Sequence, residues 1–287
     1  MIASINTNIP LLHAHGVAIP KLGFGTGRIG DKTSLDDYSE RVAHALTLGY
    51  RHIDTAWKYK TEKAVGEGIR ASGVPRDEIF LTTKVSHEYL RADDFARMVD
   101  ESLANLKLDY VDLLMIHWPS PDQAPFDETM RALGRAKREG KTRHVGVANC
   151  NIALIEDAIR LCPEPICNVQ VEYHPYLDQT KLLAAVHRLG LTLTAYCPLG
   201  RGKLIGDPVI AEIARAKGKT AAQVVLRWHM QQPDVIPIPR STHAGRQAEN
   251  LDIFDFTLND DEMKRIHALA RPDGRIANPV GRAPDWD

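Results

Sequence analysis

The strongest constraint on the fold is a repeated alternation of short apolar runs with segments of helical periodicity. Many of the helical segments end on a glycine, and the next apolar run follows almost at once. In segment 34–49, for example, Ser34 is a candidate N-cap, apolar residues recur at helical spacing, and Gly49 suits the C′ position. The apolar run 52–56 follows directly. This rhythm indicates βα units, in which each helix leads back to a parallel strand.

Eight such units can be counted along the chain. The expected strands are 22–25, 52–56, 79–85, 111–118, 143–148, 168–173, 192–196 and 235–239. The expected helices are 34–49, 61–72, 92–106, 126–139, 152–161, 180–189, 208–217, 220–231 and one from about residue 244. Linkers and low-complexity segments do not interrupt the series. The sequence therefore predicts an α/β fold, a (β/α)8 TIM barrel, forming a single domain over residues 1–287.

Two segments lie outside this eightfold pattern. Residues 9–13 and 17–19 flank Ala14-His15-Gly16, which predicts an N-terminal β-hairpin that can plug the bottom of the barrel. At the other end, Asn259 begins a C-terminal helix through residue 270. The irregular, proline-containing tail 271–287 follows and can cover the mouth of an active site.

Composition excludes several classes of function. The 36 Lys and Arg residues balance 37 Asp and Glu residues, and no long basic run occurs, so we expect no nucleic-acid partner. The N-terminus does not resemble a signal peptide, and nowhere do eighteen apolar residues run together, so we expect a cytoplasmic protein without a membrane partner. We also expect a monomer. The four cysteines show no C-x-x-C spacing and no clustering with histidine, so we expect neither disulfides nor a metal site.

A glycine-rich motif near the N-terminus suggests a different fold. Residues 25–30 spell G-x-G-x-x-G after a strand, and Asp54 stands 24 residues further on, as in a dinucleotide-binding Rossmann fold. However, residues 31–33 separate the last glycine from the helix, and eight units are too many for that fold. We interpret the motif as a glycine-rich first βα loop.

The candidate catalytic residues stand where the expected strands end. A barrel collects its reactive side chains at the carboxyl ends of its strands, where Asp54, Lys84 and His117 stand, and Tyr59 lies in the loop that follows the strand of Asp54. Each has an ordinary structural explanation when it is taken alone. Together they form a cluster, because a buried lysine needs a carboxylate such as Asp54 to offset the cost of its desolvation.

These residues also carry a resemblance to a known family. The segment 49–56, Tyr59, Val65-Gly66, Lys84 and the segment 116–119 resemble the motifs of the aldo-keto reductase superfamily, in order along the chain. The resemblance implies that Asp54, Tyr59, Lys84 and His117 are the catalytic residues of a carbonyl reductase.

Physical chemistry assigns roles that agree with the resemblance. Hydride addition leaves negative charge on the carbonyl oxygen, so a proton donor is needed, and a phenol is too weak an acid unless a nearby cation lowers its pKa. We expect Lys84 to be that cation for Tyr59, with Asp54 holding Lys84 in place. His117 is expected to donate a hydrogen bond to the substrate oxygen. Trp57 and Trp118 are expected to form apolar walls beside the substrate.

The resemblance also implies a nicotinamide cofactor. Asn149 and Gln170 would bind its carboxamide, Tyr196 would stack on its ring, and Arg240 with Arg246 would bind a 2′-phosphate. The full set of implied cofactor residues is Thr26, Asn149, Gln170, Tyr196, Leu199, Arg240, Ser241, Thr242, Arg246, Glu249 and Asn250. Arg240 stands where the family usually has lysine; it keeps the charge but changes the geometry. We therefore expect NADPH, with NADH retained as an alternative.

The end of the chain indicates the substrate class. Residues 283–287 look like the tail of bacterial diketogluconate and methylglyoxal reductases, and the loop 200–207 is short. We therefore expect a small, open pocket for small aldehydes, α-dicarbonyls and keto-sugars. Cys150 and Cys197 are expected near the cofactor, which suggests a sensitivity to oxidation.

Two other functions remain open at this stage. In a barrel aldolase, Lys84 would form a Schiff base with the carbonyl substrate. In a non-catalytic protein of the same fold, nucleotide binding would persist without turnover. The first predicts a trappable adduct on Lys84, and the second predicts cofactor binding without consumption.

Overall fold

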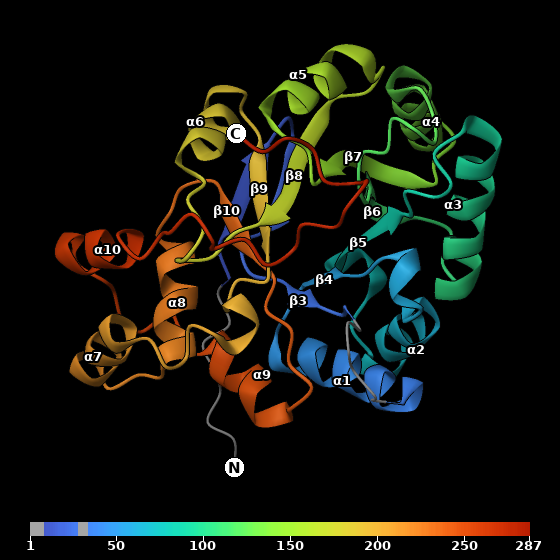
Figure 1. Cartoon of the computed structure of the whole chain (residues 1–287). Helices are drawn as coiled ribbons and strands as arrows, with labels where there is room; N and C mark the ends of the chain where they lie inside the picture. Colours follow the sequence, from blue (N-terminus) through green and yellow to red (C-terminus); the bar gives the residue numbers. More distant parts are fainter. Residues whose placement is uncertain (1–8, 28–33) are drawn as a thin grey trace.

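A closed barrel of parallel strands forms the centre of the molecule (Figure 1). The computed structural model describes residues 9–27 and 34–287, so Arg28, Ile29 and Gly30 of the glycine-rich motif lie outside the described residues. The strands, which pair in chain order, are β3 Phe24–Gly25, β4 His52–Asp54, β5 Phe80–Val85, β6 Val111–Ile116, β7 Thr142–Ala148, β8 Ile166–Glu172, β9 Thr192–Tyr196 and β10 Val235–Pro237. Gly25 N–H donates to Pro239 O and Gly23 N–H to Pro237 O, both at 3.0 Å. These bonds join β3 to the segment of β10 and close the barrel that the sequence predicts.

Helices surround the barrel on its outside (Figure 1). Their bounds are α1 Leu35–Leu48, α2 Glu62–Ser72, α3 Ala92–Leu106, α4 Phe126–Arg138, α5 Ile152–Leu161, α6 Thr180–Arg188, α7 Pro208–Lys217, α8 Ala221–Met230, α9 Ala244–Leu251 and α10 Asp260–His267. Three 3₁₀ turns complete the described elements: η1 Trp57–Tyr59, η2 Arg76–Glu78 and η3 Gly200–Gly202. The expected capping boxes of Thr220 and Asn259 are both formed, which sets the starts of α8 and α10.

The N-terminal hairpin packs against the amino ends of the barrel strands. Its strands β1 Leu11–Ala14 and β2 Val17–Pro20 pair antiparallel around the two-residue turn His15-Gly16. Both turn residues have positive φ, 48° and 79°, as the tight hairpin turn requires. Ile19 is fully buried in a cluster with side chains of β5, β6, β8 and β10. The hairpin is confirmed, and its position at the bottom of the barrel matches the prediction.

The C-terminal tail crosses the opposite end of the barrel, where the strands end. In Figure 1 it runs from α10 across the strand ends back toward α5 and α6. Trp286 packs edge to face on Trp118, with 6.3 Å between ring centroids, so the tail reaches the loop that follows β6. Within the described parts of the chain, none of the helices has both the length and the apolar character to cross a membrane.

Candidate active site

A buried ion pair forms the base of the site. Asp54 ends β4, and Lys84 lies near the end of the neighbouring strand β5, so both side chains reach the same end of the barrel. Lys84 Nζ donates to Asp54 Oδ1 at 2.7 Å, to Asp54 Oδ2 at 2.8 Å and to the Thr55 carbonyl at 2.8 Å. Both residues are buried: the exposed fraction is 0% for Lys84 and 1% for Asp54. Burial lowers the pKa of Lys84, and the facing carboxylate of Asp54 opposes that change.

Tyr59 and His117 lie next to this pair. Tyr59 ends η1, which follows β4 directly, and Lys84 Nζ lies 5.2 Å from the centroid of its ring. His117 follows β6, and its ring packs edge to face on Tyr59 with 5.4 Å between centroids. The structure therefore brings together the four residues that the strand ends predict.

The pKa of Tyr59 differs from the expectation. Desolvation raises it well above 10, and the negative charge of Asp54 raises it further. The predicted lowering by Lys84 is wrong for this state of the protein, because burial of the phenol and the charge of Asp54 dominate its pKa. Burial, and then the positive charge of Lys84, lowers the pKa of His117 well below 6.5. At neutral pH, the phenol of Tyr59 therefore keeps its proton and the imidazole of His117 carries no charge.

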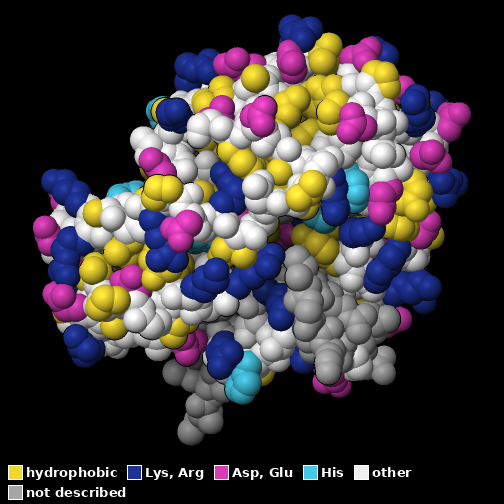
Figure 2. Space-filling model, viewed as in Figure 1, with side chains coloured by type: hydrophobic (Ala, Val, Ile, Leu, Met, Phe, Trp, Pro, Cys, Tyr) yellow, Lys and Arg dark blue, Asp and Glu magenta, His cyan; other side chains and the backbone are white. Residues whose placement is uncertain are grey.

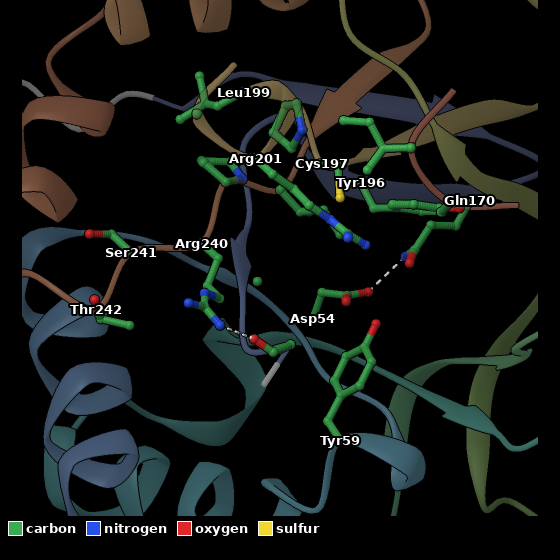
Figure 3. Close-up of a pocket in the computed structure, with 18 of the residues that line it drawn as sticks. Asp54, Tyr59, Gln170, Tyr196, Cys197, Leu199, Arg201, Arg240, Ser241 and Thr242 are labelled. Atoms are coloured by element: carbon green, nitrogen blue, oxygen red, sulfur yellow. Dashed lines mark hydrogen bonds between the residues drawn. The ribbon is translucent and has the colours of Figure 1, made fainter. Parts of the chain in front are cut away.

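A long cavity of about 1250 Å³ opens from this cluster. Tyr59, His117 and Trp118 line it at the end next to the ion pair, and the segment 238–242 lines it farther away. In Figure 3, the Tyr59 hydroxyl and the Gln170 amide point toward Asp54, and Arg240, Ser241 and Thr242 lie on the other side of the site. A cavity of this volume has room for a dinucleotide and a small second molecule.

Three polar side chains in the middle of the cavity are already linked to the catalytic residues. Gln170 Nε2 donates to Asp54 Oδ2 at 2.7 Å, which Figure 3 marks with a dashed line. Asn149 Nδ2 donates to the His117 carbonyl at 2.8 Å, and Tyr196 O–H donates to Asn149 Oδ1 at 2.7 Å. The expected carboxamide partners Asn149 and Gln170 therefore line the cavity. Their hydrogen bonds to His117 and Asp54 fix their orientations.

The far end of the cavity is basic. Its lining includes Arg240, Ser241, Thr242, Arg246, Glu249 and Asn250, all of which were expected at a cofactor. The Arg240 guanidinium donates to the Gly27 carbonyl at 2.6 Å, which holds it across the cavity (Figure 3). Glu249 accepts from Thr220 Oγ1 at 2.7 Å. Two guanidiniums beside the start of α9 are suitable for a phosphate group.

Two predicted contact residues do not reach the cavity. Thr26 is fully buried, and its hydroxyl donates to the Asp54 carbonyl at 3.0 Å. The Trp57 indole donates to Glu101 of α3 at 2.9 Å, and Lys60 Nζ lies 3.0 Å from the centroid of its ring. Both side chains bind neighbouring elements in this structure, and their expected contact roles stay predictions. Leu199 and Trp118 do line the cavity.

Sequence reasoning missed several lining residues. Arg201 of η3 lines the cavity, as do Ile276, Ala277, Asn278, Pro279 and Arg282 of the tail. The proline-containing composition of the tail predicted that it covers the site, and this is confirmed, but it did not indicate which tail side chains face inward.

The thiols do not have the environment of reactive cysteines. Cys150 is fully buried, and burial raises its pKa. Cys197 lines the cavity, but burial raises its pKa as well. Reactive cysteines have lowered pKa values, so the structure argues against the oxidation sensitivity that the sequence suggested. Groups of three or more potential metal ligands are absent from residues 9–27 and 34–287.

The fold and this end of the barrel define an oxidoreductase that acts on carbonyl groups with a nicotinamide cofactor. The chain belongs to the aldo/keto reductase family, whose family model matches residues 21–271. Members of this family use NAD(P)H.

Curated relatives agree with this class. Methylglyoxal reductase DkgB of Escherichia coli O157:H7 is 43% identical over 273 residues, which cover 94% of this chain and 100% of that protein. Glyoxal reductase of Bacillus subtilis is 39% identical over 266 residues, covering 92% of this chain and 94% of the relative.

Solved structures share the architecture. One, of a protein described as a 2,5-diketo-D-gluconic acid reductase B, has a TM-score of 0.94 and 47% identity and covers 98% of both chains. The aldo-keto reductase of Bombyx mori in complex with NADP has a TM-score of 0.87 and 33% identity, over 94% of this chain and 95% of that one.

Proposed function

We propose that the chain reduces small aldehydes, α-dicarbonyls and keto-sugars to alcohols, with NADPH as its preferred cofactor. One observation carries the proposal: a single cavity joins Tyr59 and His117, next to a buried Lys84–Asp54 pair, to a basic end at Arg240. The names of the relatives, methylglyoxal and glyoxal reductase, support the substrate class.

The cavity residues fit the cofactor. Arg240 and Arg246 would hold the 2′-phosphate of NADPH, while the ring of Tyr196 would lie against the nicotinamide. Gln170 Nε2 is committed to Asp54, so we assign its Oε1 as an acceptor for the carboxamide. When bound, NADPH supplies a hydride to the carbonyl carbon.

Tyr59 would donate the proton that the carbonyl oxygen receives. Its raised pKa keeps the phenol protonated in the resting enzyme, so the proton moves only as negative charge develops on the substrate oxygen. The phenolate left behind lies beside the charge of Lys84, whose Nζ is 5.2 Å from the ring centroid. Asp54 keeps Lys84 oriented and charged despite its burial.

His117 would orient the substrate. Because its lowered pKa leaves the imidazole neutral, its ring N–H can donate to the carbonyl oxygen without giving up a proton. Tyr59 and His117 lie edge to face, so a single oxygen can accept from both groups. Trp118 would form the apolar wall beside the carbonyl.

The test is NADPH consumption, followed at 340 nm, with methylglyoxal, a keto-sugar and an aromatic aldehyde. We expect NADPH to be preferred over NADH and Tyr59→Phe to lose about 10²-fold to 10⁴-fold in kcat. Tyr110→Phe is the matched control, because Tyr110 precedes β6 at the other end of the barrel. Binding of NADPH, measured by fluorescence, should be unchanged in both variants.

Each alternative predicts a different result. A preference for NADH would keep the chemistry but contradict the roles of Arg240 and Arg246. Binding of NADPH without turnover of any carbonyl would refute the reductase and favour a non-catalytic protein. Trapping of a substrate on Lys84 by borohydride would favour an aldolase.

A further inference from the structure

The C-terminal tail is held against the site by specific contacts. Glu172, at the end of β8, is fully buried and accepts from the backbone N–H groups of Ile276 and Ala277, both at 2.6 Å. A Cβ on Gly274 would lie 1.7 Å from the carbonyl oxygen of Tyr176, so only glycine allows the tail to approach here. The tail is therefore fixed where it passes the carboxyl end of β8.

Its last residues are anchored as well. The Trp286 ring lies 3.7 Å under the Arg275 guanidinium, and its indole donates to Asn278 Oδ1 at 3.0 Å. Asp287 Oδ2 accepts from the Ile152 N–H at the start of α5, also at 3.0 Å. Both ends of the segment 276–287 are thus attached, and the residues between them have a defined position over the cavity.

Arg282 lies within this fixed segment. It is half-buried and lines the cavity together with Tyr59, His117 and Trp118. The backbone N–H of Arg282 donates to the Pro279 carbonyl. Its guanidinium, in contrast, has no hydrogen-bond or ion-pair partner among the residues that the structure describes. The guanidinium is not among the buried polar groups that lack a partner, so it is accessible at the cavity and can pair with an anionic ligand.

The groups that face Arg282 leave its charge uncompensated. Arg282 is close enough to His87 and His117 that its charge contributes to lowering the pKa of both imidazoles. Glu88, which follows His87 in the chain, accepts from Lys58 at 2.7 Å and from Ser86 at 2.8 Å, so it is already engaged. Figure 2 shows Lys and Arg side chains around the hollow on this face of the molecule.

We propose that Arg282 forms a subsite for a carboxylate on the carbonyl substrate, so that the enzyme favours oxo-acids over neutral carbonyl compounds of the same size. The proposal rests on the proposed function, since the carbonyl of such a substrate must reach Tyr59 and His117. A carboxylate can pair with the charge of Arg282, and the charge of Lys58 is already balanced by Glu88. The planar guanidinium can bind both carboxylate oxygens.

The anionic group takes no part in the bond changes. Hydride still adds to the carbonyl carbon, and the oxygen still takes a proton from Tyr59. NADPH is oxidised, the carbonyl becomes an alcohol, and the carboxylate leaves unchanged. Arg282 therefore contributes to substrate affinity, and its loss should appear in KM more than in kcat.

The experiment compares 4-oxobutanoate with its methyl ester, which keeps the aldehyde and removes the charge. For Arg282→Gln, we expect KM for 4-oxobutanoate to rise about 10-fold, equivalent to about 1.4 kcal/mol, with kcat changed less than about two-fold. The ester should be unaffected. Arg282→Lys should show an intermediate KM, because it keeps the charge but loses the two-point geometry. Arg160→Gln, on the exposed face of α5, removes the same charge outside the cavity and should behave as wild type.

Two results would overturn the proposal: equal changes for the acid and the ester, or no change for either. If the wild type turned over neither substrate, the proposed function would fail instead. Thermal unfolding of each variant, in the absence of substrate, separates a loss of binding from a loss of folding. Added salt should raise KM for the acid in the wild type but leave KM for the ester constant.

Discussion

Removing Lys84 from its buried ion pair with Asp54 should destabilise the protein far more than removing Arg131 from its exposed ion pair with Asp127. Lys84 Nζ lies 2.7 Å from Asp54 with side-chain exposures of 0% and 2%. Arg131 and Asp127 also lie 2.7 Å apart, but their side chains are 62% and 43% exposed. The two pairs therefore share a separation and differ in burial.

The magnitudes follow from that difference. At 2.7 Å and an effective dielectric constant of about 20, the attraction of the buried pair is about 6 kcal/mol, against a desolvation cost of several kcal/mol for each ion. Lys84→Met leaves Asp54 buried without its cation, so we expect a loss of about 3 to 5 kcal/mol in unfolding free energy. Arg131→Met should lose only about 0.3 to 0.5 kcal/mol.

Urea unfolding at pH 7, followed by tryptophan fluorescence, measures both changes. The double variant Asp54→Asn/Lys84→Met removes both charges and should be more stable than Lys84→Met alone, because no ion is left buried without its partner. Equal losses for Lys84→Met and Arg131→Met would refute the reasoning. The reasoning would also be refuted if the double variant lost as much unfolding free energy as Asp54→Asn and Lys84→Met lose together as single variants.

Two further predictions concern stability. Burial lowers the pKa values of His52 and His229 to about 4. Between pH 6.5 and 4, the unfolded chain therefore binds protons that the folded chain does not. As the pH is lowered through this range, the unfolding free energy should decrease by about 3 kcal/mol for each histidine. Identical urea midpoints at pH 7 and pH 5 would contradict this. In helix α2, Ala is intrinsically preferred over Gly, yet Gly66→Ala would place its Cβ 2.1 Å from the Leu106 carbonyl oxygen, so we expect a loss of at least about 2 kcal/mol. In urea unfolding, Gly206→Ala, whose Cβ meets nothing within 4 Å, should be neutral, and a similar loss in both variants would show that the steric argument is wrong.

Local patterns predicted most of the elements. The bounds of α3, α5, α7 and β9 agree with the expected ranges residue for residue. The expected strand 111–118 was too long, since β6 ends at Ile116 and His117 already belongs to the loop. Periodicity identifies an apolar run but cannot show where pairing with a neighbour stops, because that depends on the partner strand.

The sequence by itself determined the barrel and the cluster of Asp54, Tyr59, Lys84 and His117. The physical reason is that parallel strands place all their carboxyl ends on one face, so strand order is sufficient to bring these residues together. Asp54 and Lys84 lie in the strands themselves, whereas Tyr59 and His117 stand in the loops just beyond the strand ends.

Only the tertiary structure decided which loop and tail side chains face the cavity. Trp57 turns away because Glu101, 44 residues further along the chain, accepts from its indole. The tail presents Arg282 because Glu172 binds backbone N–H groups more than a hundred residues away in sequence. The pKa of Tyr59 likewise depends on burial and on the Asp54 charge, not on spacing along the chain. Such long-range contacts leave no periodic signal, since any local sequence with the right donors and acceptors can make them.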